Sequence, residues 1–213
     1  MSPATRLSAP QCNPPEAGNS KGQNEGGGVM GRKSKTKGSA YELKIAKLMS
    51  LWWRGDFHRV PASGGLNWGA DSRVAGDIVP PQGLDFPFVI ECKKREEWTM
   101  DHILLDISQP KEWWAQVVND ARRVKKVPML IFSRNRAKDF VMIPYVEPFY
   151  DLLDVNHHDV MRTTVTIKNI REEVQKFDVI VTTMDNIKRI PPQQMREYSE
   201  LVKDWDPYAD EYK

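Results

Sequence analysis

The clearest strand of the chain reads Phe86-Pro87-Phe88-Val89-Ile90-Glu91-Cys92-Lys93. Successive side chains of a strand point to opposite faces, so Glu91 and Lys93 lie on one face together with Val89. The residues between them are apolar and point to the other face, into a core. The segment therefore predicts a strand that places a carboxylate beside an amine. A plainer interpretation is a surface strand with a solvated acid–base pair, because Glu-x-Lys is common on strands.

A second carboxylate precedes this strand in Val74-Ala75-Gly76-Asp77-Ile78-Val79. The residues Pro80-Pro81-Gln82-Gly83 are typical of a turn, so we expect a hairpin that brings Asp77 beside Glu91. Two oxygen ligands at adjacent strand ends suit Mg²⁺, which binds one or two carboxylates and keeps water for its other positions. Lys93 can orient an attacking water and offset charge on a phosphate. The pattern therefore predicts a divalent-metal site that acts on a phosphate.

Length and charge fit one domain that could bind a polyanion locally. At 213 residues the chain can form a single domain with a substantial core. Its formal net charge is only +2, so any nucleic-acid surface has to come from clusters of cations. Three such clusters occur, although a charge run is often only a solvated face: Arg32, Lys33, Lys35 and Lys37; Arg122, Arg123, Lys125 and Lys126; and Arg134, Arg136 and Lys138.

Cysteine content and hydropathy indicate a cytoplasmic protein. Only Cys12 and Cys92 are present, far apart in the sequence. This excludes a zinc ribbon or a disulfide scaffold and favours a reducing compartment. The sequence has no stretch that resembles a membrane span, and its first residues lack the apolar segment of a signal peptide. We therefore expect a soluble, intracellular protein without a membrane partner.

The first part of the chain predicts a disordered basic tail followed by a helix. Residues 1–37 are rich in Pro, Gly, Asn, Ser and Lys and show no apolar periodicity. A helix should begin at Ser39, which forms a capping box with Glu42 three positions later. Apolar side chains then follow at helical spacing and predict its buried face: Tyr41, Ile45, Leu48 and Trp52.

The order of the remaining elements predicts an α/β fold around one mixed sheet. These elements are a strand at 57–60, a loop at 61–65, a helix at 110–126, strands at 127–132, 140–143, 163–167 and 179–183, and a polar helix from Gln193. The helix at 110–126 has the broadest apolar face: Trp113, Trp114, Val117, Val118, Ala121 and Val124. We expect a core over residues 38–150 and a C-terminal extension over residues 151–213 that packs its strands and helix on that core.

The tryptophans leave two interpretations open. Trp68 and Trp98 lie in polar loops near the predicted metal site, where they could stack on nucleic-acid bases or pack against their own domain. Trp113 and Trp114, like the pair Trp52-Trp53, are better explained as core residues or as part of a dimer surface.

The elements together resemble the PD-(D/E)-x-K nuclease superfamily, and most closely its Holliday-junction resolvases of the archaeal and phage type. The resemblance covers roughly residues 37–145 and depends on the order of its segments. In place of the usual proline, Gly76 precedes the first aspartate of the signature. The matching segments are Lys37-Gly38-Ser39-Ala40-Tyr41-Glu42, Arg59-Val60-Pro61-Ala62-Ser63-Gly64-Gly65, Gly76-Asp77-Ile78, Glu91-Cys92-Lys93, Trp113-Trp114-Ala115-Gln116 and Pro128-Met129-Leu130-Ile131-Phe132.

This resemblance implies a restriction-endonuclease-like mixed β-sheet flanked by helices, with residues 38–150 as the nuclease core. It assigns metal binding to Asp77 and Glu91, perhaps with Glu42, and water positioning to Lys93. Arg59 and Ser63 would approach the scissile phosphate, and Gln116 would stand behind the site. Three of these residues also have plainer explanations, since Glu42 could cap a helix, Ser63 could satisfy backbone groups and Gln116 could be an ordinary polar residue.

By resemblance the protein is a Mg²⁺-dependent, structure-specific endodeoxyribonuclease of DNA recombination and repair, with Mn²⁺ able to substitute. It would be a homodimer, in the cytoplasm of a bacterial or archaeal host if phage-encoded, that makes paired nicks in four-way junctions. The basic tail, Arg59 and the cluster from Arg122 to Lys126 would contact DNA. Two alternatives stay open: a restriction-like nuclease that acts on duplex, ends or flaps, and a non-catalytic DNA-binding assembly protein with a vestigial nuclease core.

Overall fold

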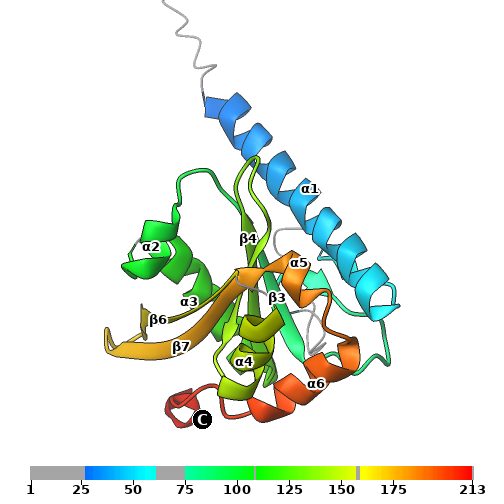
Figure 1. The fold of residues 1–213 in the computed structure, drawn as a ribbon. Coiled ribbons are helices and arrows are strands. Elements are labelled where there is room, and N and C mark those ends of the chain that lie inside the picture. Colours follow the sequence, from blue (N-terminus) through cyan, green and yellow to red (C-terminus); the bar gives the residue numbers. More distant parts are fainter. Residues whose placement is uncertain (1–26, 61–74, 108, 157–158, 213) are drawn as a thin grey trace, which may run out of the picture.

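A five-stranded mixed sheet forms the centre of the computed structural model, which describes residues 27–60, 75–107, 109–156 and 159–212 (Figure 1). The sheet has the order β3-β4-β5-β7-β6, and only the pair β3–β4 is parallel. Its strands are β3 (Phe88–Lys94), β4 (Val127–Ser133), β5 (Phe140–Pro144), β6 (Val160–Lys168) and β7 (Val174–Thr183). The mixed α/β sheet expected from the sequence is thus confirmed.

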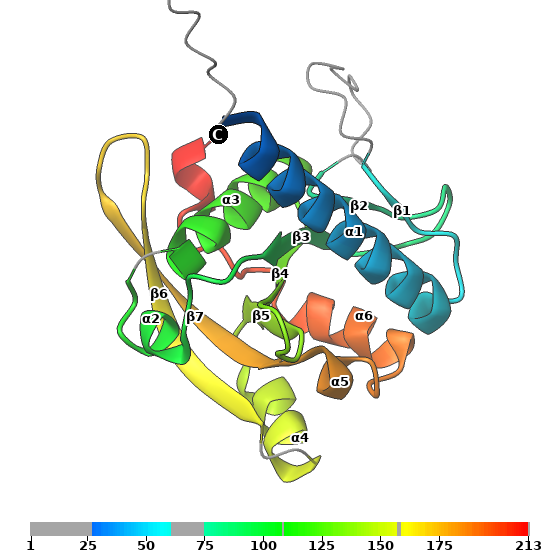
Figure 2. The ribbon, with the colours of Figure 1, turned by 90° about the horizontal axis from the view of Figure 1, so that it is seen from above.

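Helices cover both faces of the sheet (Figure 2). One face packs against α1 (Gly27–Trp53), α4 (Glu147–Asn156), α5 (Met184–Ile187) and α6 (Pro192–Leu201). The other face packs against α2 (Met100–Leu104) and α3 (Gln109–Val124), and the chain ends in a short 3-10 helix, η1 (Ala209–Tyr212). Alternate residues of β4 enter opposite cores, and the strand is buried throughout, as expected for a strand covered on both sides.

Helix α1 begins earlier than the sequence predicted. Its backbone is helical from Gly27, so Ser39 lies inside the helix and cannot cap it. Helix α1 thus includes residues 27–37 of the expected tail, while residues 1–26 lie outside the described part of the chain, and their disorder stays a prediction. The physical reason is that the Lys and Arg residues of this stretch are good helix formers, and the internal glycines Gly31 and Gly38 cost only about 1 kcal/mol each.

The predicted hairpin between Asp77 and Glu91 is also wrong in direction. The short strand β2 (Ile78–Val79) pairs with β1 (His58–Arg59), not with β3. Gly76 instead makes a parallel bridge to Ile90. The connection after β2 is long enough to return to the start of β3, where buried Phe86 anchors it in the core. Asp77 still comes to lie next to β3, as predicted, but at its edge and in parallel orientation.

The C-terminal extension is part of the sheet. Strand β7 lies between β5 and β6, and Tyr198 of α6 donates a hydrogen bond of 2.6 Å to the carbonyl of Pro144. Helices α2 and α4 were not predicted: α2 is only five residues long, and α4 lies where no apolar periodicity was identified. In the described part of the chain, no helix is long and apolar enough to cross a membrane.

Most of the tryptophans discussed above belong to the cores. Trp53, Trp113 and Trp114 are buried in their own domain, so they cannot form the subunit contact considered for them. Trp98 is 1% exposed and lies 3.4 Å from the carbonyl of Ser133, which excludes base stacking in this conformation. Trp68 lies outside the described residues.

Candidate active site

Asp77 is fixed at the edge of β3 by a close backbone approach. Its N–H donates to the carbonyl of Ile90 at 2.7 Å, and its Oδ2 accepts the N–H of Cys92 at 2.8 Å. The approach requires glycine at position 76, where φ is +72° and a Cβ atom would lie 2.3 Å from Ile90 O. Proline, whose φ is fixed near −65°, cannot adopt this conformation, which explains why Gly76 stands at the usual proline position.

Glu91 lies beside Asp77, on the face of β3 that looks toward α3. Glu91 is only 1% exposed to solvent. One of its oxygens, Oε1, is 2.5 Å from Lys93 Nζ and accepts a hydrogen bond of 2.6 Å from Gln116 Nε2. The strand periodicity thus correctly predicted that Glu91 and Lys93 share a face, and the structure brings Gln116 to the same carboxylate.

The two carboxylates share a buried site, where Asp77 disfavours the charge of Glu91. Burial, and then the neighbouring Asp77, raise the pKa of Glu91 to about 8, although Lys93 opposes the shift. Burial likewise raises the pKa of Asp77, while the Cys92 N–H and Lys93 counteract it. A hard divalent cation would compensate two adjacent carboxylates that one lysine compensates only in part, so this donor set fits Mg²⁺.

Glu42 of α1 lies at the rim of this pair. Its Oε2 is 3.3 Å from the guanidinium of Arg59, and its pKa is raised by burial and by Asp77. Among the described residues, no three His, Cys, Asp or Glu side chains converge on one ion position. Asp77 and Glu91 are therefore the pair that could hold a metal here, and Glu42 has Arg59 as its partner.

Asp120 is a site residue that the sequence analysis missed. Its charge raises the pKa of both Asp77 and Glu91, and it lies on α3 four residues after Gln116. Residues at this spacing share a helix face, so the position of Gln116 was the signal that could have identified Asp120. Arg123 lies 3.3 Å from the Asp120 carboxylate.

The other predicted site residues fall outside the described part or away from this pair. Ser63 belongs to residues 61–74, which are not described. Helix α1 includes Arg32, Lys33 and Lys35, whose side chains are not described. Lys37, on the same helix, is exposed. Lys125 is exposed near the end of α3, and Lys126 accepts a hydrogen bond from Trp205 through its carbonyl.

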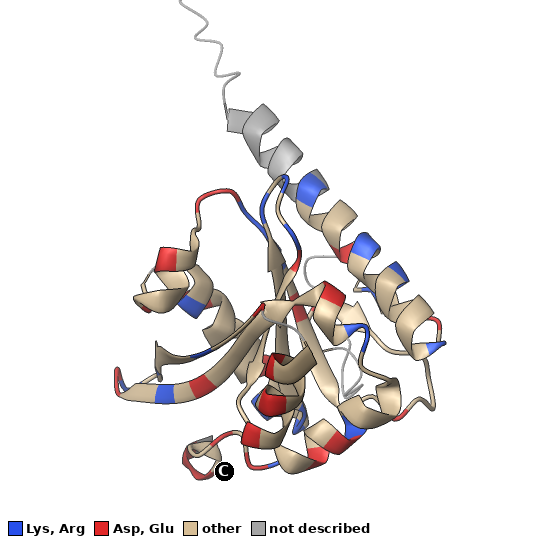
Figure 3. Ribbon diagram, viewed as in Figure 1, with Lys and Arg blue, Asp and Glu red and all other residues tan. Residues whose placement is uncertain are grey.

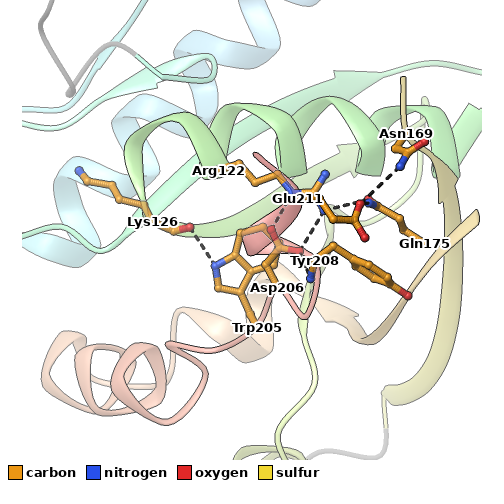
Figure 4. A network of polar contacts seen from close by, with 8 residues as sticks. All are labelled: Arg122, Lys126, Asn169, Gln175, Trp205, Asp206, Tyr208 and Glu211. Carbon is orange, nitrogen blue, oxygen red and sulfur yellow. Dashed lines mark hydrogen bonds and ion pairs between the residues drawn. The ribbon is translucent and has the colours of Figure 1, made fainter. Parts of the chain in front are cut away.

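Arg122 has a different role from the DNA contact expected of it (Figure 4). Its side chain is 8% exposed and makes two hydrogen bonds to Asp206, of 2.6 and 2.9 Å, and one of 2.9 Å to Gln175. It also lies over the ring of Phe177. Because the C-terminal segment covers it, Arg122 holds that segment against α3 and β7, and we do not propose it as a DNA contact.

The sequence matches the family model "Phage putative PDDEXK endonuclease" over residues 33–197. The chain belongs to this endonuclease family. PDDEXK endonucleases are typically metal-dependent, and the matched range includes Asp77 and the Glu91-Cys92-Lys93 signature. The superfamily inferred from the sequence is thus confirmed.

Further comparisons add little about this PDDEXK endonuclease. Comparison with curated proteins gives no significant match. Among solved structures, it is similar to Hjc, a Holliday junction resolvase from the hyperthermophilic archaeon Archaeoglobus fulgidus. The likeness has 16% sequence identity and a TM-score of 0.31, and it covers 76% of this chain and 96% of Hjc. It is too distant to bear on function.

Proposed function

We propose that this endonuclease is a Mg²⁺-dependent endodeoxyribonuclease that makes paired nicks in four-way DNA junctions. The observation that carries the proposed chemistry is the arrangement around Glu91, a buried carboxylate that lies beside Asp77 and contacts both Lys93 and Gln116. A plain structural ion pair would explain Glu91 and Lys93 but not a second buried carboxylate next to them, which is costly without a cation.

The residues of the site would have different roles in hydrolysis. Asp77 and Glu91 would hold Mg²⁺, or Mn²⁺ in its place, and when bound the ion would increase the acidity of a water and stabilise charge on the phosphate and the leaving oxygen. The Cys92 N–H keeps Asp77 in place, and Gln116 does the same for Glu91. Lys93, whose side chain is 20% exposed, would orient the attacking water and offset charge on the phosphate.

The proposed substrate is a branched DNA. Support comes from the ordered segments that resemble junction resolvases, from Lys37-Gly38-Ser39 to the strand at Pro128. The cations near the site suit phosphates, which position DNA without specifying its sequence. Junction preference would therefore come from the arrangement of two subunits rather than from base contacts.

We propose that two copies associate through an apolar groove along α1. Leu43 and Leu51 are 46% and 83% exposed, and the groove also includes Leu48 and Trp52. Exposed apolar side chains that gather in one patch mark association surfaces. Paired nicks on opposing strands need two active sites, and a second copy on this groove would supply the second one.

Cleavage of a synthetic four-way junction and of a linear duplex with the same sequence tests this proposal. In Mg²⁺ we expect symmetric paired nicks in the junction and slow cutting of the duplex. Equal cleavage rates on the junction and the duplex would exclude junction preference and indicate a general DNA endonuclease. Binding without any metal-dependent cutting would instead favour a DNA-binding assembly protein with a vestigial core.

A further inference from the structure

We propose that the turn between β4 and β5 is a phosphate-binding hairpin, in which Arg134 and Arg136 hold the DNA strand just beyond the active site. This inference rests on the proposed function in one respect only, namely that the bound polyanion is DNA. It concerns a cluster of cations that is not among the DNA contacts implied by the family resemblance.

The position of the turn follows from the pairing of β3 with β4. Lys93 lies opposite Phe132 and Lys94 opposite Ser133, so Arg134 follows directly after the paired region. At about 3.3 Å per residue, the turn extends roughly 10 Å beyond the level of Lys93. Phosphates of one DNA strand follow each other at about 3.4 Å along the helix axis, so this distance corresponds to about three phosphates. A strand that is cut next to Lys93 and runs along β3 toward the turn would pass it.

Cations dominate the surface around this turn. Figure 3 shows Lys and Arg residues on the turn, on the segment after β3 and on α1. Arg134 and Arg136 are both exposed, and neither forms an ion pair with any residue that the structure describes. The guanidinium of Arg134 lies 5.8 Å from the ring centre of Trp98. Lys138 lies 3.5 Å from Asp159, so it contributes less net charge.

Two acidic side chains beside the turn, Glu96 and Asp139, are engaged in contacts within the structure. Both oxygens of Glu96 lie 3.2 Å from the N–H of Asn135, which ties this carboxylate to the turn itself. Asp139, at the base of the turn, pairs with Lys44 of α1 at 2.5 Å. Arg134 and Arg136 are therefore the exposed arginines of the turn that remain available to a polyanion.

Hydrogen bonds of Ser133 anchor the two ends of the turn, which reduces the entropic cost of binding. Ser133 is 0% exposed, and its Oγ lies 3.1 Å from the carbonyl oxygens of both Arg134 and Lys138. Arg136 has a φ of 59°, as expected in a tight turn. The planar guanidinium group offers two parallel donors that match a phosphate. A rigid turn with two such groups fits a DNA backbone.

The double variant Arg134→Ala/Arg136→Ala tests the proposal by equilibrium binding. A labelled four-way junction and a linear duplex serve as probes in EDTA, where a metal-dependent enzyme does not cut, over a series of salt concentrations. We expect at least a tenfold weaker affinity at moderate salt. The slope of log K against log salt should fall by about 2, since each phosphate contact contributes about 0.9. The melting temperature should stay unchanged, because both side chains are exposed.

Two further variants separate a specific contact from a general loss of charge. Lys168→Ala/Arg171→Ala removes two exposed cations from the β6–β7 hairpin and should change affinity less than twofold. Arg134→Lys/Arg136→Lys keeps the charge and should retain most of the salt slope while binding more weakly than wild type. An unchanged slope in the alanine variant, or an equal loss in the β6–β7 control, would overturn the proposal. A wild type that binds with this slope but never cuts would refute the nuclease function and leave the hairpin assignment intact.

Discussion

The side-chain amide of Gln116 donates a hydrogen bond of 2.6 Å to Glu91 Oε1, the oxygen that Lys93 Nζ approaches at 2.5 Å. One carboxylate oxygen thus connects helix α3 with the signature residues of β3. The contact fixes the orientation of Glu91 within a buried site, and it gives the glutamine of α3 a structural reason to stand there.

Gln116→Ala should lower kcat about 10- to 100-fold, the usual effect of removing a group that orients a metal ligand. The melting temperature should change little, because Gln116 is exposed on its outer side. Steady-state kinetics and thermal unfolding measure the two effects. Gln193→Ala, which removes an exposed glutamine bonded to Glu197 in α6, serves as the control and should have wild-type activity. Unchanged kcat in Gln116→Ala would show that the contact is incidental.

Gly76→Ala should abolish cleavage and destabilise the fold strongly. A Cβ atom there would lie 2.3 Å from Ile90 O, so the backbone that carries Asp77 would have to move. Gly83→Ala is a matched control, because Gly83 also has a positive φ, of 79°, but has no heavy atom within 4 Å of its Cβ position. We expect it to cost only about 1–2 kcal/mol and to keep activity. Similar denaturation midpoints for both variants would contradict the assigned role of Gly76.

Asp206→Ala should lower the free energy of unfolding by about 3–5 kcal/mol, since it leaves the buried guanidinium of Arg122 without its main partner. Urea denaturation measures the change. Asp178→Ala, which breaks the exposed pair with Arg162, should have a much smaller effect. If Asp206→Ala were as stable as Asp178→Ala, the C-terminal segment would not be held through Arg122.

Light scattering should report a dimer for the wild type and a monomer for Leu51→Lys. Leu51 is 83% exposed in the apolar groove of α1, and a lysine there would add a further positive charge to a contact that Lys44 and Lys47 already line. Ile170→Lys is the control, because Ile170 is 93% exposed but lies in the β6–β7 turn, and it should remain dimeric. A monomeric wild type would exclude the dimer, and a dimeric Leu51→Lys would exclude the groove as its contact.

The sequence predicted the parts of the site that follow from local periodicity. Glu91 and Lys93 share a face because successive side chains of a strand point to opposite sides. The apolar face of α3 was predictable from the helical spacing of its apolar residues. The parallel approach of Gly76 to Ile90 was not predictable from turn residues. Pro80 and Pro81 are compatible with a segment that runs either parallel or antiparallel to β3.

Residues that act through distant partners were the least predictable. In the sequence, Arg122 belongs to a basic cluster that suggests a charged surface. In the structure it is buried against Asp206, which lies far along the chain. The start of α1 was misjudged because Ser39 fits a cap but nothing before it stops a helix. Trp98 looked like a loop residue, whereas its ring packs against Phe132 and Phe140.

Cleavage of a labelled four-way junction by the wild type, Asp77→Asn and Glu91→Gln, each in Mg²⁺ and in EDTA, tests whether the two carboxylates form the catalytic metal site. The wild type should cut in Mg²⁺ and not in EDTA. Both variants should fail to cut while binding the junction as tightly as the wild type or tighter, because each loses a metal ligand and one negative charge near the phosphate. If either variant cuts in Mg²⁺ at more than a small fraction of the wild-type rate, Asp77 and Glu91 are not the metal ligands.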